Sequence, residues 1–342
     1  MKKKNRLSKK NRITRAKISS PESDRILSLI KKTKEEISKV VVGQDDIVDG
    51  LIRAIIANGH VLVEGVPGIA KTLTVRALAV ATGCEFKRIQ FTVDLLPTDI
   101  IGITSLSPDK SEFEILKGPV FSNFVIADEI NRAPPKTQSA LLEAMGEKQV
   151  SIGRETYSLH EPFFVMATQN PIESAGTYPL PEAQMDRFLF KLLATYPKKE
   201  EEERIIEQNI ALKSFDSYGV KQIMSPKDII SMQKLVQEVQ HTPRINKYIV
   251  DLVNATRNWK DYNLNLGKYI AFGASPRASI YLFLGAKADA FVNGQKFVNP
   301  SNIKSVACDA MRHRIILNYR AQIDNVTSDD IINEILSKVR VP

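Results

Sequence analysis

HVLVEGVPGIAKTLTV, residues 60–75, joins an apolar run to a glycine-containing turn and then to a helix-forming segment. The run HVLVEG (60–65) has the length of a strand, and the segment from Lys71 to Thr82 predicts a helix that ends at Gly83. A strand, a glycine turn and a helix with Lys and Thr at its start form a trap for anions, because backbone N–H groups and the helix N-terminus face the ligand. The stretch therefore predicts a phosphate loop of the form G-x-x-x-x-G-K-[ST].

The position before the lysine departs from this pattern. Gly65, Lys71 and Thr72 match it, but Ala70 stands where glycine is expected. A negative φ at Ala70 costs nothing and favours the helix, whereas a positive φ costs on the order of 1 kcal/mol of strain. Gly65 and Gly68 still allow the turn and a close approach to phosphate. We expect Lys71 to reach the β- and γ-phosphates and the Thr72 hydroxyl to bind Mg²⁺; the alternative is a tight turn with a chance lysine.

Polar side chains follow two further apolar strands. FVIADE delivers Asp128 and Glu129, and FFVMATQNP delivers Asn170. Because ligands collect at the carboxyl ends of strands in an open α/β sheet, we expect Asp128 to hold Mg²⁺ through its water shell and Glu129 to act as general base on the attacking water. Asn170 can hold that water or the γ-phosphate. The alternatives are solvated acids at a strand end and a turn-forming Asn before Pro171.

Two arginines complete the candidate site. Arg187 precedes the last strand, and Arg277 lies in the first turn of a helix that begins at Ser275 and Pro276. A cation at a helix N-terminus opposes the helix dipole, so we expect an anion nearby, either a nucleotide phosphate or a surface glutamate. Arginines that neutralise transition-state charge contribute large rate factors to phosphoryl transfer.

The order of apolar runs predicts an α/β fold. Runs of strand length alternate with helical segments, which indicates a mostly parallel sheet covered on both faces. Two segments interrupt the alternation, 92–121 and 149–162. We interpret them as inserts that each carry a hairpin, with turns at 108–110 and at Gly153 and Arg154. From Lys198 onward the pattern is helical, and one helix is expected to start after Ser225 with Pro226 at its first position. We expect a core over 21–197, a connecting helix and linker over 198–221, and an all-helical domain over 222–342.

The net charge of +9 comes from the beginning of the chain. Residues 1–20 hold nine Lys or Arg and no acid, and the remaining 39 basic residues balance the 39 acidic ones. We interpret 1–20 as a solvated, disordered tail rather than a tether to nucleic acid or an anionic membrane. No apolar run in the sequence approaches a membrane span, and neither the two cysteines nor the four histidines have metal-ligand spacing. These features favour an intracellular, cytoplasmic protein without zinc.

Taken together, the motifs resemble those of AAA+ ATPases, and specifically of the MoxR family. The resemblance spans residues 40–280, and its most specific block is 127–145. The family pattern has alanine before the lysine, so Ala70 does not indicate a dead site. The resemblance is carried by GVPGIAKT (65–72), RIQFTVDLLPTDI (88–100), ADEINRAPPKTQSALLEAM (127–145), ATQNP (167–171), GTYPLPEAQMDRF (176–188) and GASPRA (273–278).

The resemblance implies a role for each matching position. It implies that Asn170 is sensor 1, that Arg187 is an arginine finger reaching a neighbouring subunit, and that Arg277 is sensor 2, acting on its own or a neighbour's nucleotide. It also implies an αβα core with a helix-2 insert at 92–121 and a pre-sensor-1 hairpin at 149–162, followed by a helical lid. The expected nucleotide contacts are Val42 and Gln44 near the adenine and, in the loop, Gly65, Val66, Pro67, Gly68, Ile69, Ala70, Lys71, Thr72 and Leu73.

The same resemblance implies a ring-shaped ATPase, typically a hexamer, that uses ATP and Mg²⁺ to remodel or mature a protein client. A partner with a von Willebrand factor A domain is implied as well. Nothing in the sequence identifies the client, and the tail at 1–20 lies outside the family pattern.

Proteins of three other functional classes share these core motifs. An ATP-driven nucleic-acid motor is disfavoured because the body is neutral and the second insert offers only Lys148 and Arg154 as nearby cations. A motor subunit of a metal chelatase is disfavoured by the block 127–145. A nucleotide-binding scaffold without catalysis is disfavoured because Glu129 and Asn170 are intact, as is Arg187.

Overall fold

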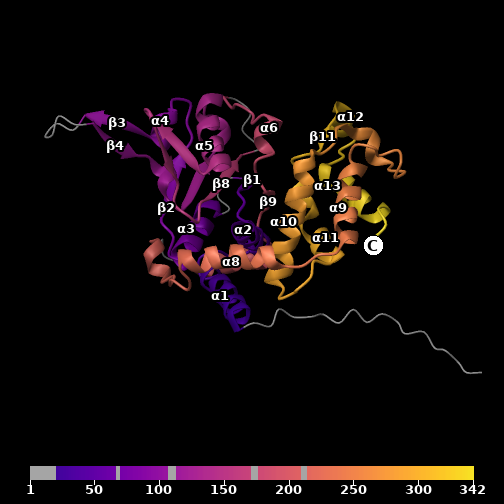
Figure 1. Cartoon of the computed structure of the whole chain (residues 1–342), viewed down its shortest axis with the longest axis horizontal. Helices are drawn as coiled ribbons and strands as arrows, with labels where there is room; N and C mark the ends of the chain where they lie inside the picture. Colours follow the sequence, from indigo (N-terminus) through magenta and orange to yellow (C-terminus); the bar gives the residue numbers. More distant parts are fainter. Residues whose placement is uncertain (1–20, 67–69, 107–112, 171–175, 209–213) are drawn as a thin grey trace, which may run out of the picture.

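The computed structural model describes residues 21–66, 70–106, 113–170, 176–208 and 214–342. In Figure 1 a sheet flanked by helices occupies one half of the molecule and a group of helices occupies the other. Pro67, Gly68 and Ile69 lie outside the described residues, as does the expected turn of the first insert at 108–110.

Within the described residues, five parallel strands form the central sheet in the order β2-β5-β8-β1-β9. Successive residues of β1 belong to different hydrophobic clusters: Val61 and Val63 to one, Leu62 to the other. This two-residue period places one cluster on each face of the sheet, as expected for a sheet covered on both sides. The strands are β1 (Val61–Gly65), β2 (Phe86–Gln90), β5 (Phe124–Asp128), β8 (Phe164–Gln169) and β9 (Phe190–Ala194).

Helices from different parts of the chain cover the two faces. One cluster contains buried residues of the first three long helices, and the other contains those of the helix after β5 together with the first insert. The expected parallel α/β core is therefore confirmed. The helices are α1 (Pro21–Ile37), α2 (Asp45–Ile56), α3 (Lys71–Thr82), α4 (Pro97–Ile101), α5 (Pro135–Glu147) and α6 (Glu182–Met185), with short 3₁₀ turns η1 (Pro119–Phe121) and η2 (Ile130–Arg132).

Both inserts contain the expected antiparallel hairpin. The first pairs β3 (Gly102–Leu106) with β4 (Phe113–Lys117). The second pairs β6 (Gln149–Ile152) with β7 (Glu155–Ser158) and turns at Gly153, whose φ of 63° suits glycine. Figure 1 shows the first hairpin at the end of the core farthest from the helices of the lid.

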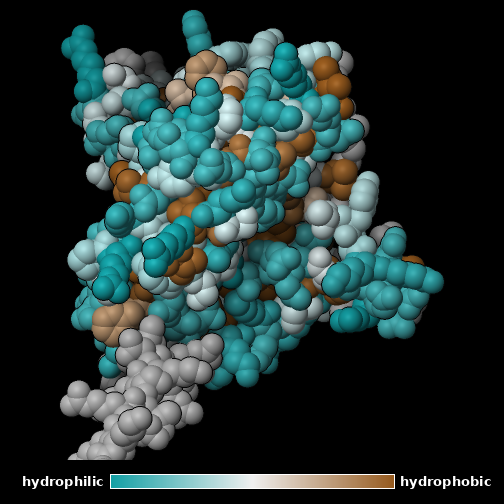
Figure 2. All heavy atoms as spheres, turned by 90° about the vertical axis from the view of Figure 1, so that its right-hand side faces the viewer, coloured by the Kyte–Doolittle hydropathy of each residue, from teal (hydrophilic) through white to brown (hydrophobic). Residues whose placement is uncertain are grey.

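From Lys199 onward the described part of the chain is helical, with one addition that the sequence did not predict. A short antiparallel ladder joins β10 (Ile270–Phe272) to β11 (Ile316–Leu317) inside the lid. Figure 2 shows this side of the molecule, mostly hydrophilic with scattered apolar patches. The elements are α7 (Lys199–Gln208), η3 (Phe215–Tyr218), α8 (Pro226–Glu238), α9 (Pro243–Ala255), η4 (Leu266–Tyr269), α10 (Pro276–Val292), α11 (Pro300–Met311), α12 (Tyr319–Ile323) and α13 (Ser328–Lys338).

Helix α8 connects the two halves of the molecule. Ser225 caps it in a capping box with Asp228, and Pro226 stands at its first position, as the sequence indicated. The helix packs on α1 and α2 of the core and on α10 of the lid. The exact domain boundaries at 197 and 222 remain predictions. No helix among the described residues is long and apolar enough to cross a membrane.

Candidate functional site

A pocket of ≈ 740 Å³ opens at the carboxyl ends of the parallel strands. It brings together the start of α3, the ends of β5 and β8, and segments that follow β9. Among the predicted residues, those that line the pocket are Val42, Gln44, Ala70, Lys71, Thr72, Leu73, Asp128, Glu129 and Asn170. Gly65 ends β1, and Val66 packs against the hydrophobic core.

Ala70 adopts the left-handed conformation, with φ 60° and ψ 19°. Of the two possibilities that the sequence left open, the strained one is therefore present, at a cost of about 1 kcal/mol. This conformation turns the chain from the loop into α3, where Thr74 donates hydrogen bonds back to the Ala70 carbonyl. The Lys71 ammonium donates to the Gly65 carbonyl at 2.5 Å. Burial lowers the pKa of Lys71, while the carboxylates of Asp128 and Glu129 oppose that shift.

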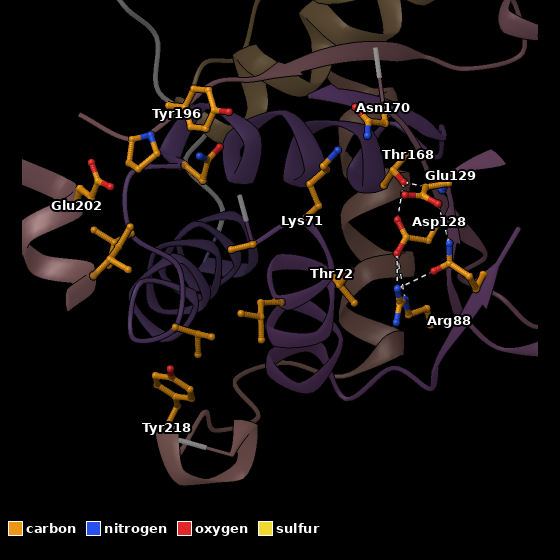
Figure 3. Close-up of a pocket in the computed structure, with 18 residues that line it drawn as sticks. Lys71, Thr72, Arg88, Asp128, Glu129, Thr168, Asn170, Tyr196, Glu202 and Tyr218 are labelled. Carbon is orange, nitrogen blue, oxygen red and sulfur yellow. Dashed lines mark hydrogen bonds and ion pairs between the residues drawn. The ribbon is translucent and has the colours of Figure 1, made fainter. Parts of the chain in front are cut away.

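Asp128 has a protein partner on each carboxylate oxygen. The Thr168 hydroxyl donates to Oδ1 at 2.6 Å, and the Arg88 guanidinium donates to Oδ2 at 2.6 and 3.1 Å. Neither partner was expected from the sequence, although Thr168 lies two residues before Asn170 at the end of β8, so both side chains lie on the side of the pocket. Figure 3 shows Arg88 directed at Asp128, on the same side of the pocket as Thr72. The carboxylate is therefore fixed in orientation before any ligand enters.

Glu129 is held by side chains from both sides. Its carboxylate accepts from Gln90 at 3.1 Å and pairs with Arg132 at 2.9 Å. Its backbone is left-handed, with φ 56°, and its N–H donates to the Thr168 hydroxyl at 2.9 Å. Strained backbone of this kind is retained where surrounding contacts determine the conformation. Here the contacts keep the Glu129 side chain in the lining of the pocket beside Asp128 (Figure 3).

The opposite part of the pocket is lined by aromatic and apolar residues that no motif indicated. Figure 3 shows Tyr196 and Tyr218 on different sides of this part, with Glu202 nearby. The predicted adenine-side residue Gln44 is buried, and its amide donates to the Thr195 carbonyl at 3.1 Å. Gln44 thus ties the start of α2 to the end of β9. Tyr218 enters from η3, which the tertiary structure alone brings to the pocket.

Arg187 and Arg277 line a separate cavity of ≈ 310 Å³. The Arg187 guanidinium donates to the Leu142 carbonyl at 2.9 Å, and Arg277 pairs with Asp186 at 3.5 Å. Among the described residues that line the larger pocket, neither arginine is present. The structure therefore brings the two arginines together, but not to Lys71 of the same chain.

His60 lies buried beside this second cavity. Its Nδ1 accepts from the Val165 N–H at 3.1 Å, so its Nε2 carries the proton and faces the Met145 carbonyl at 3.2 Å. Burial lowers the pKa of His60 to about 4, and the ring is neutral at neutral pH.

The pocket suits a magnesium–phosphate complex better than a metal alone. Among the described residues, no three His, Cys, Asp or Glu side chains form a metal-binding group. The Thr72 hydroxyl and the Asp128 carboxylate offer hard oxygen ligands in one pocket. Mg²⁺ typically takes one or two protein oxygens and completes its shell with water and substrate phosphates, so these residues fit it.

Comparisons with known proteins agree with this geometry. A family model described as "ATPase family associated with various cellular activities (AAA)" matches residues 60–190, and an AAA lid domain matches 265–335. "Chaperone MoxR1" of Mycobacterium tuberculosis is 46% identical over 310 residues, which cover 90% of this chain and 81% of that protein. The chain belongs to the MoxR family of AAA+ ATPases. As a MoxR-family protein it binds nucleotide and hydrolyses ATP.

Other relatives support the MoxR assignment. "Protein MoxR" of Methylorubrum extorquens is 30% identical, with 90% of this chain and 94% of that protein covered. "Uncharacterized protein YeaC" of Bacillus subtilis is 45% identical, with 92% and 95% covered. A crystal structure from Cytophaga hutchinsonii, provisionally assigned as an ATPase, superimposes with a TM-score of 0.88 at 48% identity, covering 94% of this chain and 97% of that one. The predicted family and fold class are confirmed, as is ATPase activity, while the roles of individual residues remain predictions.

Proposed function

We propose that this MoxR-family ATPase hydrolyses ATP at sites shared between neighbouring subunits of a ring, typically a hexamer, and uses the cycle to remodel a protein client. The observation that carries the proposal is the shared cavity of Arg187 and Arg277, apart from the pocket of Lys71. The name "Chaperone MoxR1" of the M. tuberculosis relative supports a protein client. A partner with a von Willebrand factor A domain belongs to the same proposal through the family resemblance.

Within the pocket each side chain has a distinct task. Lys71 leaves the Gly65 carbonyl and binds the β- and γ-phosphates, while Thr72 and Asp128 hold Mg²⁺. The metal, when bound, neutralises charge that develops on the phosphates. Glu129 takes a proton from the attacking water, and Asn170 orients that water beside it. The partners of Asp128 and Glu129 keep both carboxylates in place, which lowers the reorganisation that the reaction requires.

Arg187 and Arg277 supply charge to a neighbour's phosphates in this proposal. Both reach one cavity from different elements, Arg187 after α6 and Arg277 from the first turn of α10. A head-to-tail ring places such a surface of one subunit against the nucleotide pocket of the next. Each active site is then complete only in the assembly, and both arginines act in trans.

The nucleic-acid motor remains the less supported alternative. Lys148, at the base of the second hairpin, already contacts Asn58 at 3.0 Å and Glu161 at 3.6 Å. It is therefore a poor candidate for tracking a phosphate backbone.

Steady-state ATP turnover at a series of protein concentrations tests the shared site. Turnover per subunit should rise with concentration in the natural chain. Arg187→Ala should bind ATP but hydrolyse it at least about 100-fold more slowly, because removal of such an arginine costs large rate factors. Arg154→Ala, an equal charge change on the exposed second hairpin, is the matched control. Turnover that depends neither on concentration nor on Arg187 would rule out the shared-site ring.

A further inference from the structure

We propose that Arg88 is the counter-ion of Asp128 when no metal is bound. When the metal–nucleotide complex binds, Arg88 leaves Asp128 and Mg²⁺ takes its place. Arg88 is then a positioning residue that sets how strongly metal and nucleotide binding are coupled. The inference rests on the proposed function, in which Asp128 and Thr72 hold Mg²⁺.

The sheet register aims Arg88 at Asp128. Gln90 on β2 stands opposite Asp128 on β5, and Arg88 lies two residues before Gln90, so both side chains project from the same face. Arg88 donates to Oδ2 of Asp128 through Nε at 3.1 Å and Nη2 at 2.6 Å. Nη2 also donates to Gln90 Oε1 at 2.7 Å, which fixes the guanidinium in this position.

Both carboxylate oxygens of Asp128 are therefore occupied by the protein itself. Thr168 holds Oδ1, and Arg88 holds Oδ2 with two donors. A guanidinium and a hydrated Mg²⁺ both need the lone pairs of Oδ2, and two cations on one oxygen repel each other. Arg88 lines the same pocket as Thr72 (Figure 3), so the guanidinium and Mg²⁺ also compete for the same space.

The exposure of the pair makes the exchange feasible. The Arg88 side chain is 49% exposed, whereas that of Asp128 is 16% exposed. Arg88 can swing toward solvent and regain hydration, while Asp128 stays anchored through Thr168. Half-exposed ion pairs are weak enough for a divalent cation to displace one partner.

This exchange has a thermodynamic consequence. Without metal, Arg88 neutralises a carboxylate that would otherwise repel the nucleotide phosphates. Loss of Arg88 should weaken metal-free nucleotide binding and at the same time remove the competitor of Mg²⁺. The factor by which Mg²⁺ tightens nucleotide binding should then rise, and by linkage the nucleotide tightens Mg²⁺ binding by the same factor.

The experiment measures the Kd of ADP carrying a fluorescent N-methylanthraniloyl group, once with EDTA and once with saturating Mg²⁺. The readout is the Kd with EDTA divided by the Kd with Mg²⁺, which is the factor by which Mg²⁺ tightens binding. A purely structural defect would weaken both affinities without changing this ratio. Arg88→Gln should raise the ratio about threefold to fivefold. Arg88→Lys keeps the charge and should remain near the natural ratio. Arg132→Gln makes the same charge change beside Glu129 and should shift the ratio less than twofold.

The outcomes separate this inference from the function on which it rests. An unchanged or lower ratio in Arg88→Gln would overturn the inference, since Arg88 would then support Asp128 in the metal-bound state. Asp128→Asn should bring the ratio close to one. If Asp128→Asn keeps the natural ratio, the proposed metal site itself is wrong, whatever Arg88 does.

Discussion

Arg187 and Arg277 face one cavity of the chain, and groups of the core hold both in place. The Leu142 carbonyl accepts a hydrogen bond from Arg187, and Asp186 pairs with Arg277. Two guanidinium groups placed together repel each other unless anions lie between or beside them. Asp186 supplies one anion, and we propose that a neighbour's nucleotide supplies another.

Complementation between inactive chains should restore ATP hydrolysis. Lys71→Ala removes the phosphate ligand of a chain's own site, and Arg187→Ala removes its contribution to the neighbour's site. Each variant alone should be inactive. In an equal mixture, about a quarter of the interfaces in a head-to-tail ring combine an intact Lys71 with an intact neighbouring Arg187. Coupled-assay turnover of the mixture should therefore recover a substantial fraction of the natural rate.

The control mixture combines Lys71→Ala with a chain that carries both substitutions. That mixture has no intact interface and should stay inactive. Recovery in the control, or none in the test mixture, would contradict a site shared between subunits.

Ala70→Gly should leave the free energy of unfolding unchanged or raise it by up to about 1 kcal/mol. Glycine relieves the left-handed strain, which stabilises the fold, but it also loses more chain entropy on folding, which offsets part of that gain. Ala79→Gly, in the interior of the same helix, should lower it by about 1 kcal/mol, since glycine is unfavourable there. Urea unfolding measures both. A clear loss of stability in Ala70→Gly would show that the alanine methyl makes contacts that outweigh the strain.

Asp186→Asn should weaken the attachment of the lid to the core. Arg314 is buried and pairs with Asp186 at 2.7 Å, and it also donates to the Phe188 carbonyl at 2.5 Å. Burial lowers the pKa of Arg314, and Asp186 offsets that effect. Removing the carboxylate leaves a buried cation without a counter-charge, which costs about 3 kcal/mol of unfolding free energy. Calorimetry measures the unfolding free energy, and Asp261→Asn, on the exposed surface of the lid, is the control. An equal loss in both variants would refute the role of Asp186 as the counter-charge of Arg314.

Acidification should destabilise the protein through His60. Its pKa is about 4 in the folded chain and about 6.5 in the unfolded chain, so the unfolded chain binds more protons between these values. Stability therefore rises with pH across this window, and lowering the pH from 7 to 5 costs about 2 kcal/mol. His60→Asn keeps an acceptor for the Val165 N–H but does not titrate. Its unfolding midpoint should fall less between pH 7 and 5 than that of the natural chain, and an identical fall would contradict the prediction.

The sequence was sufficient for the parts of the site that are local in the chain. The phosphate loop, Glu129 and Asn170 each follow a strand, and Asp128 is the last residue of one. Parallel strands place their carboxyl ends at one edge of the sheet. The periodicity also indicated the helical lid and the cap at Ser225. It did not reveal the β10–β11 ladder, because two or three residues are too few to show an alternating pattern.

Other features depended on contacts between distant segments. Arg88 reaches Asp128 only because β2 pairs with β5, and Tyr218 reaches the pocket only because η3 returns to α3, where Arg76 stacks on Phe215. The sequence likewise left the sign of φ at Ala70 open, since an isolated loop allows either value. What the sequence determined by itself was the set of chemical groups and the edge at which they gather. Strand register and lid docking decided which of those groups touch, because such contacts depend on distances that no local pattern encodes.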